Sequence, residues 1–343
     1  MRETVIHPTR AGKRRRKAAI PLPIKRGLNP SRVRVPAEAQ GLTAEEYLRL
    51  VIAGQRLRHD SDDDTALRAR FTAGEVVRRD GSKFTPDMPV TPGEDVFFYR
   101  IPIDDDSVIP PLPVLFADEL ITVFAKPHGI VTAPKGSYIT RSLVVAGRRT
   151  TGNDDLVPIH RLDRLTAGIV VCVNQPEYRG AYQNLFRDCA VDKRYQAVAA
   201  CPEPAKQLPA VPWTVENRLV KIHGEVQTEV CDGPVNAVTE IVAVSALSAT
   251  QRQHAANFLP LQADTAYLVL DLHPLTGKTH QLRRHCSDLG YPLVGDPIYP
   301  VIHRDQLRAG SPIGVGLGLA CTAMTFTDPV TGERREFHYN WLE

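Results

Sequence analysis

The chain has 343 residues, which is long enough for one large or two modest domains, and 43% of them are apolar, as in globular proteins with a sizeable core. Its six cysteines include no Cys-x-x-Cys pair, which argues against a disulfide framework or a zinc ribbon. No stretch approaches about 18 apolar residues, and no apolar run follows the basic N-terminus, so we expect neither a membrane helix nor a secretory signal. A cytoplasmic protein with reduced thiols fits these features.

Positive charge is concentrated at the N-terminus. Residues 1–35 contain eleven Lys and Arg and a single acid, Glu3, although the whole chain has a net charge of only +3. We predict a flexible basic arm that contacts a polyanion, and the alternative is a solvated tail without a partner. The densest part of the arm is Lys13, Arg14, Arg15, Arg16 and Lys17.

A small domain is predicted over residues 36–103, followed by a linker rich in Asp and Pro over residues 104–113. Thr43 and Glu46 have the spacing of a capping box, so a helix is expected to begin there. Short strands are predicted at 74–77 and 96–99, beside turns that contain Gly81 and Gly93.

From residue 114 onward the sequence indicates a mixture of strands and helices. The segments expected to be regular are strands over 120–125, 169–173, 195–198 and 267–272 and a helix over 179–186. No fixed-period repeat is present, which disfavours a solenoid or a propeller. Because regular helices do not separate the strands, a doubly wound parallel sheet is also disfavoured.

Several motifs for cofactors or metals are incomplete. The segment 276–279 ends like a phosphate-binding loop, but Leu272 stands where that motif requires glycine, and the segment 314–319 lacks the third glycine of a dinucleotide fingerprint. Histidines 273, 280 and 285 lack the spacing of a helical metal pair. The sequence therefore predicts no nucleotide cofactor and no metal site.

Four segments are more informative as a set: 125–131, 160–168, 193–198 and 275–283, the last followed by 290–299. Asp163, in the run His-Arg-Leu-Asp-Arg-Leu-Thr-Ala-Gly, lies in a short charged loop directly before an apolar strand, a common place for a catalytic residue. Considered alone, it would be a surface carboxylate in an ion pair of little energetic value.

Together these segments resemble the pseudouridine synthases that modify ribosomal large-subunit RNA and tRNA, in the branch with the HRLDxxTSG signature. The resemblance covers roughly residues 114–330 and keeps the family's order. It implies an α+β fold over residues 114–343 with a mixed, largely antiparallel central sheet and flanking helices. It also implies a monomer that acts on structured RNA without a cofactor or a metal. Departures from the family pattern at Ala125, Ala167, Lys278 and the stretch around Cys321 affect substrate fit more than chemistry.

The resemblance also implies roles for single residues. Asp163 is expected to be the nucleophile, Arg283 its cationic partner, and Tyr195 the residue that stacks on uracil and helps remove the C5 proton. Arg161 is expected to fill the gap left by the flipped uridine, as its guanidinium can stack and form hydrogen bonds. The residues predicted to bind substrate are Arg161, Leu282, Lys126 and His160.

Several alternatives remain open at this point. Asp163 is expected to attack C6 of the base or C1′ of the ribose, or to assist a glycal-type intermediate. One alternative to a synthase is an RNA-binding or ribosome-assembly factor on a catalytically silent synthase scaffold. Another is a hydrolase with an Asp nucleophile, although no second carboxylate for water activation lies near Asp163 in sequence. Residues 68–100 resemble an S4-type RNA-binding fold, and the alternative is a family-specific cap.

Overall fold

The computed structural model describes residues 21–55, 57–103, 109, 112–136, 138–201, 211–307 and 316–343. The chain divides into two compact units: a small unit of Met1–Lys25 and Asn29–Ile101, and a large unit of Arg26–Leu28 and Pro102–Glu343. The basic cluster Lys13–Lys17 of the predicted arm and most of the predicted linker lie outside the described residues.

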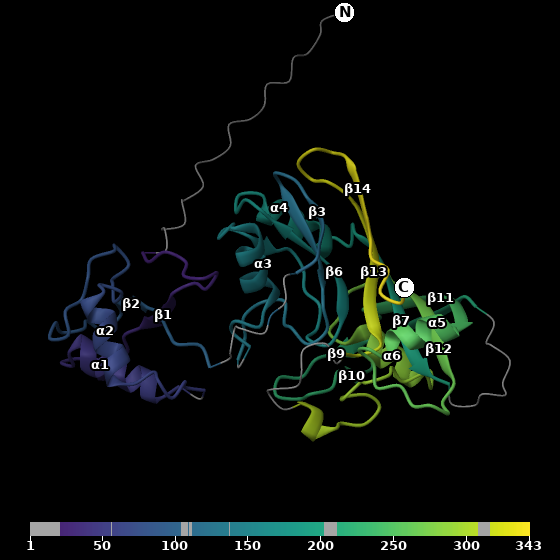
Figure 1. Cartoon of the computed structure of the whole chain (residues 1–343), viewed down its shortest axis with the longest axis horizontal. Helices are drawn as coiled ribbons and strands as arrows, with labels where there is room; N and C mark the ends of the chain where they lie inside the picture. Colours follow the sequence, from purple (N-terminus) through teal and green to yellow (C-terminus); the bar gives the residue numbers. More distant parts are fainter. Residues whose placement is uncertain are drawn as a thin grey trace, which may run out of the picture. The chain divides into compact units, whose positions relative to one another are not determined.

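The small unit combines two helices with a two-stranded antiparallel sheet (Figure 1). Its strands are β1 (Ser31–Arg34) and β2 (Asp95–Phe98), and its helices are α1 (Ala44–Ala53) and α2 (Asp64–Thr72), with a short 3-10 turn, η1 (Ala37–Ala39). The helices and β2 share one apolar core, to which they contribute Leu48, Ile52, Leu67, Phe71, Val96 and Phe98.

Local sequence signals predict much of the small unit. Thr43 and Glu46 form the expected capping box, since Thr43 Oγ1 accepts the Glu46 N–H at 3.2 Å and the Glu46 carboxylate accepts the Thr43 N–H at 2.9 Å. The strand expected at 96–99 is β2. The strand expected at 74–77 is wrong, because only Val77 makes isolated bridges there. The arm was also predicted too long, because its last residues form β1.

One ten-stranded sheet organises the large unit, in the order β3-β4-β6-β13-β7-β12-β11-β8, with β5 paired to β6 and β14 to β13. A separate two-stranded sheet pairs β9 with β10. The strands of the large unit are β3 (Val114–Ala117), β4 (Ile121–Lys126), β5 (Val157–Pro158), β6 (Ala167–Val173), β7 (Asp192–Ala200), β8 (Trp213–Asn217), β9 (Leu219–Val220), β10 (Glu229–Val230), β11 (Ala237–Ala246), β12 (Tyr267–Pro274), β13 (Leu319–Thr327) and β14 (Arg334–His338).

Pairing in the large sheet is antiparallel except between β6 and β13, which run parallel. The predicted α+β class with a mixed, largely antiparallel sheet is thereby confirmed. The four apolar runs expected to be strands are β4, β6, β7 and β12. Every residue of β6 is buried, because neighbouring strands flank it on both sides and cores cover its faces, which explains its continuous apolar sequence.

Helices cover different halves of this sheet (Figure 1). Tyr182 of α4 and Leu143 of α3 pack in one core with β4 and β6, whereas Leu282 and Cys286 of α6 pack in another with β7 and β12. Ala255 of α5 belongs to a third core. The helical segments are α3 (Leu143–Thr151), α4 (Arg179–Arg187), α5 (Ala249–Ala255), α6 (Gln281–Asp288) and the 3-10 turn η2 (Arg304–Leu307).

Gly168 lies at the start of β6, directly after the Asp163 loop. Its φ is +111°, and a Cβ at this position would lie 2.3 Å from the Cys321 carbonyl oxygen and 2.4 Å from the Cys321 nitrogen. Only glycine tolerates both the backbone angle and the close approach of β13. The glycine that ends the His-Arg-Leu-Asp motif is therefore a packing requirement for the loop that precedes it.

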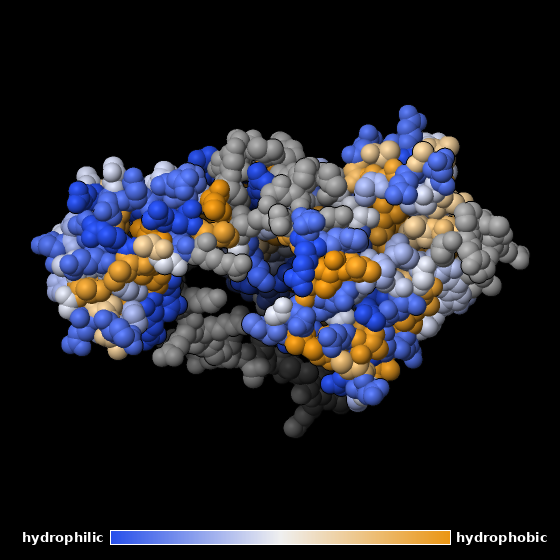
Figure 2. Space-filling model, turned by 90° about the horizontal axis from the view of Figure 1, so that it is seen from below, coloured by the Kyte–Doolittle hydropathy of each residue, from blue (hydrophilic) through white to orange (hydrophobic). Residues whose placement is uncertain are grey.

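The surface of the molecule mixes polar and apolar side chains. On the face shown in Figure 2, hydrophobic residues are interspersed with hydrophilic ones, as is normal for protein surfaces. No helix within the described ranges is long and apolar enough to cross a membrane. All six cysteines are free thiols, and Cys172, Cys286 and Cys321 are buried.

Candidate active site

The loop that carries Asp163 lies between β5 and β6 and rests on the segment that follows β4. Thr132 Oγ1 donates to the Leu162 carbonyl at 2.9 Å and accepts the Leu162 N–H at 3.0 Å. The Gly129 N–H donates to the Arg164 carbonyl at 2.9 Å. The segment 125–131, which contains a Lys-Pro-His-Gly turn, and the His-Arg-Leu-Asp loop are separate in the sequence and form one structure beneath the carboxylate.

His128 adds another support for this loop. Its Nδ1 donates to the Leu165 carbonyl at 2.6 Å, and its ring stacks on Phe258 with centroids 5.3 Å apart. Burial lowers the pKa of His128 to about 4. The ring is therefore neutral at pH 7 and carries its proton on Nδ1, because a carbonyl can only accept.

Lys126, the last residue of β4, is fully buried, and its predicted contact with substrate stays a prediction. Its Nζ donates to the carbonyls of Pro127, Ile130 and Arg164 at 3.0, 2.9 and 3.3 Å. Burial lowers the pKa of Lys126 to about 7, and the charge of Asp163 opposes this shift. Three acceptors match the three donors of an ammonium, so Lys126 holds the turn and the Asp163 loop together.

His160 also serves the fold, and its predicted contact with substrate stays a prediction. Its Nε2 accepts the Val171 N–H at 3.1 Å, and its ring stacks on Phe186 at 4.5 Å. Burial lowers the pKa of His160 to about 3. A neutral ring thus satisfies a main-chain donor of β6 at the entrance to the loop.

Asp163 and Arg283 lie 120 positions apart in sequence and meet in the structure. Arg283 Nη1 donates to Asp163 Oδ2 at 3.1 Å. The Arg283 side chain is 4% exposed, whereas that of Asp163 is 32% exposed. A fixed cation therefore contacts the carboxylate from the protein interior, while the carboxylate itself remains accessible.

Asp296 fixes the position of this cation. Nε and Nη2 of Arg283 donate to Asp296 at 2.9 and 2.7 Å, and Asp296 Oδ1 also accepts the N–H groups of Ile298 and Tyr299. Burial alone would lower the pKa of Arg283, but the ion pairs with Asp296 and Asp163 outweigh burial and raise it. Two carboxylates share one guanidinium, so the cluster keeps a net negative charge.

Gln281, the first residue of α6, anchors the helix that presents Arg283. Its Nε2 donates to the Val238 carbonyl and to Thr239 Oγ1, both at 2.9 Å, and its Oε1 accepts the Thr276 hydroxyl at 2.8 Å. The amide is buried, and both its nitrogen and its oxygen have partners. These bonds tie α6 to β11 and thereby set the place of the guanidinium.

Tyr195 on β7 and Leu282 on α6 pack in one apolar core cluster. Burial raises the pKa of Tyr195 well above its ordinary value, with further contributions from Cys321 and Asp163. The resting hydroxyl is therefore protonated at neutral pH, which opposes the predicted role of Tyr195 as a base. A half-buried ring beside Asp163 suits the predicted stacking role.

Arg161 differs from the buried residues around it. It is exposed, and within the part of the chain that the structure describes it has no hydrogen-bond or ion-pair partner. A guanidinium near Asp163 with unused donors is suited to contact a ligand that enters from solvent.

The histidines of the large unit do not gather around a common point. His273 pairs with Glu240 at 2.8 Å and His285 with Asn217 at 3.0 Å, so these rings have different partners. Among the residues with described coordinates, no group of three or more His, Cys, Asp and Glu side chains is placed to hold a metal ion.

The chain matches one known protein family. A family model described as RNA pseudouridylate synthase matches residues 121–288, a range that contains Asp163, Tyr195 and Arg283. The chain belongs to the RNA pseudouridylate synthase family. The family expected from the ordered motifs is thereby confirmed.

Individual synthases show how far the similarity extends. Pseudouridylate synthase RPUSD2 of Homo sapiens is 27% identical over 191 residues, 55% of this chain and 31% of RPUSD2. The tRNA pseudouridine(31) synthase of Saccharomyces cerevisiae is 27% identical over 192 residues, 54% of this chain and 46% of the yeast protein. The dual-specificity RNA pseudouridine synthase RluA of Salmonella typhi is 28% identical over 233 residues, 66% of this chain and 92% of RluA. The match thus spans about a third of the length of RPUSD2 and most of RluA.

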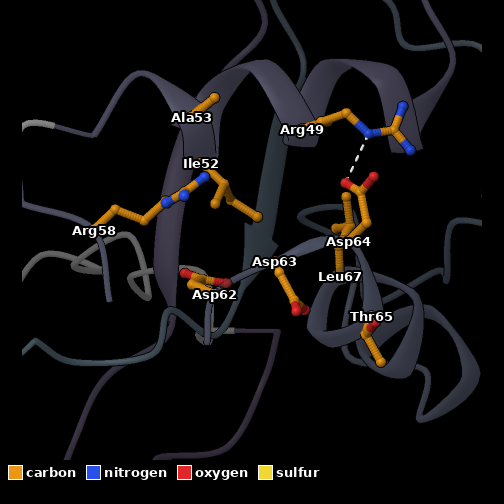
Figure 3. A pocket seen from close by; sticks show the side chains of 9 residues that line it. All are labelled: Arg49, Ile52, Ala53, Arg58, Asp62, Asp63, Asp64, Thr65 and Leu67. Carbon is orange, nitrogen blue, oxygen red and sulfur yellow. Dashed lines mark hydrogen bonds and ion pairs between the residues drawn. The ribbon is translucent and has the colours of Figure 1, made fainter. Parts of the chain in front are cut away.

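The small unit, outside the synthase match, contains a hollow lined by acidic and basic side chains (Figure 3). Asp64 accepts from Arg49 Nε at 2.8 Å, the bond drawn as a dashed line, and Asp63 caps the start of α2. Asp62 pairs with the buried Arg70. Because each carboxylate already has a partner within the fold, this hollow does not resemble the Asp163 site.

Sequence reasoning missed the residues that position the synthase site. Asp296 and Gln281 lie in motifs that were recognised, but their role follows only from contacts with Arg283 and Thr239. The sequence signal for Asp296 is the Gly-Asp-x-x-Tyr pattern at residues 295–299, within the segment 290–299. Thr132 lies one position beyond the recognised turn, and no sequence pattern distinguishes it.

Proposed function

We propose that this chain is an RNA pseudouridine synthase that isomerises uridine to pseudouridine in structured RNA without a cofactor. The observation that carries this proposal is the accessible Asp163 carboxylate, held by a guanidinium whose own charge Asp296 compensates. The reaction breaks the N1–C1′ bond of uridine and forms a C5–C1′ bond, while C5 loses a proton and N1 takes one up. Electrons balance within the nucleoside, so no redox partner is required.

Asp163 supplies the anionic oxygen for this reaction. A carboxylate that is paired with Arg283 needs no helper base to act as a nucleophile. Attack at C6, attack at C1′ and assistance to a glycal-type intermediate all use such an oxygen. The buried cation also offsets the loss of solvation when RNA covers the carboxylate.

The target uridine reaches Asp163 by flipping out of its stack, at a cost of a few kcal/mol. Arg161 is exposed close to Asp163 and fills the space that the base leaves. The ring of Tyr195 stacks on the extruded uracil, and Leu282 contributes to the apolar wall beside that ring.

The proposed substrate is ribosomal large-subunit RNA or tRNA. One support is that relatives are named as a tRNA pseudouridine(31) synthase and as a dual-specificity RNA pseudouridine synthase. A second is the basic segment Lys13–Lys17, which suits phosphate contacts that are independent of sequence. Shape and splayed-out bases then select the uridine.

Tritium release tests the proposal. Transcripts of tRNA and of large-subunit ribosomal RNA, labelled with [5-³H]uridine, are incubated with the purified chain in the presence of EDTA. Release of tritium, with pseudouridine found in the digested RNA, is expected from at least one transcript. No pseudouridine in either transcript or in total cellular RNA would contradict the proposal and favour an RNA-binding factor on a silent scaffold.

A further inference from the structure

His280 lies directly before α6 in a backbone conformation that few residues other than glycine adopt. Its φ is +56° and its ψ is +16°, and its side chain does not cap the helix. Instead, its Nε2 lies 3.7 Å from Oδ2 of Asp163, and the side chain is 11% exposed. Left-handed backbone at a non-glycine residue persists where the surrounding structure requires it, often at functional sites.

The hydroxyl of Tyr299 contacts the ring of His280 and bears on which ring nitrogen carries the proton. The Thr228 N–H donates to the hydroxyl oxygen of Tyr299 at 2.6 Å, so that oxygen is an acceptor. Tyr299 is buried, and its own proton needs an acceptor. Nδ1 of His280 lies 3.2 Å from the Tyr299 hydroxyl, and the side chain of Thr228 also contacts it. When Nδ1 accepts the proton of Tyr299, the neutral ring carries its own proton on Nε2.

Nε2 of His280 and the guanidinium of Arg283 both lie near the same oxygen of Asp163. Arg283 Nη1 donates to Oδ2 at 3.1 Å, and His280 Nε2 lies 3.7 Å from that atom. Oδ1 of Asp163 has no hydrogen-bond partner among the residues that the structure describes. Oδ2 is thus hydrogen-bonded to Arg283 and faces Nε2 of His280, whereas Oδ1 has no such neighbour among the described residues.

We propose that His280 is a positioning residue that presents a neutral Nε2–H to Oδ2 of Asp163 and so selects Oδ1 as the attacking oxygen. This inference rests on the proposed function. The main chain of Thr228 and the hydroxyl of Tyr299 orient the ring. The 3.7 Å separation shortens to a hydrogen bond when RNA fills the site, because catalytic hydrogen bonds are commonly long in free enzymes.

Two substitutions separate this role from a structural one. His280→Gln places an amide N–H near the position of Nε2, so it keeps a donor toward Asp163 and loses the acceptor for Tyr299. His280→Asn places a carbonyl near the position of Nδ1, so it keeps that acceptor and loses the donor. Asn also suits a left-handed backbone better than Gln, so a purely structural role predicts that Asn is the milder change.

In steady-state tritium-release assays, His280→Gln is expected to retain kcat within about fivefold of wild type. His280→Asn is expected to lower kcat by about 10- to 100-fold with an unchanged KM for RNA, as for loss of one donor to a reacting carboxylate. Any other order of the two variants, or a change confined to KM, would overturn the proposal.

The tautomer can be measured without any activity. In protein with ¹⁵N-labelled histidine rings, the His280 signals are assigned by their loss in His280→Gln. A protonated Nε2 and an unprotonated Nδ1 are expected, and a proton on Nδ1 would contradict the inference. A wild-type protein that makes no pseudouridine would refute the proposed function alone and leave this measurement as the test of the geometry.

Discussion

The large and small units each bury an arginine against an aspartate, and the two pairs differ in what the carboxylate can reach. In the small unit both partners are buried, with side chains 0% exposed for Asp62 and 7% for Arg70. In the large unit Arg283 is equally buried, but the Asp163 side chain is 32% exposed. An ion pair with arginine does not make an aspartate reactive; an accessible carboxylate beside a buried cation can.

The difference depends on a second carboxylate. Arg283 forms a bidentate pair with Asp296, so its charge is compensated before Asp163 is considered. In the small unit, Arg70 Nη1 and Asp62 Oδ2 are buried without a hydrogen-bond partner in the described structure. That pair compensates itself, whereas the large unit keeps a negative charge at its surface.

The largest expected effect concerns the backbone that leaves Asp163 exposed. Gly168→Ala should lower the free energy of unfolding by about 3 kcal/mol or more, because a Cβ would collide with the main chain of Cys321. Urea unfolding measures this change. Gly180→Ala is the control, since Gly180 lies in α4 with open space around it, and it should be neutral or slightly stabilising. Equal effects of the two substitutions would show that the close approach to β13 is unimportant.

Next in size is the shared guanidinium. Arg283→Lys keeps the charge but cannot hold Asp296 with two bonds and reach Asp163 at once, so kcat should fall at least about 100-fold. Tritium release at saturating RNA measures kcat. Arg284→Lys alters the neighbouring residue, whose pair with Asp288 is half exposed, and should change kcat by less than about twofold. Similar kcat values for both variants would show that the guanidinium shared by Asp296 and Asp163 is not what distinguishes the large unit from the small one.

Acid should act on the large unit through its buried neutral histidines. Burial lowers the pKa of His128 and of His285 to about 4, whereas the ordinary value is about 6.5. Between these values the unfolded chain binds more protons, so stability present above pH 6.5 is lost as the pH falls toward 4. At pH 5 each histidine should cost about 2 kcal/mol of unfolding free energy.

Both tryptophans, Trp213 and Trp341, belong to the large unit, so their fluorescence during urea unfolding at pH 7 and pH 5 measures this loss there. His285→Gln should remove its share of the pH dependence. A free energy of unfolding that is independent of pH between 7 and 5 would show that these rings are not kept neutral by burial.

The family and the fold class could be predicted because they depend on ordered motifs and apolar runs, both of which can be read directly from the sequence. Roles that depend on the direction of a side chain could not be predicted in this way. Lys126 and His160 lie in the right motifs, yet their polar atoms face main-chain groups of the loop and of β6. Asp296 acts through its hydrogen bonds to Arg283 on α6, and Gln281 acts through its hydrogen bond to Val238, which is distant in sequence. The spacing of residues in a sequence indicates that a residue belongs to a motif, but it does not indicate which atoms its side chain contacts.

The most direct test of the central claim compares Asp163→Asn with Asp62→Asn. Single-turnover tritium release and urea unfolding are measured on both variants. Asp163→Asn should lower the rate of pseudouridine formation by at least about 10³-fold while RNA binding and stability stay near wild type. Asp62→Asn should cost about 1–3 kcal/mol of stability and leave kcat within about twofold. Near-normal turnover by Asp163→Asn would contradict the assignment of Asp163 as the nucleophile.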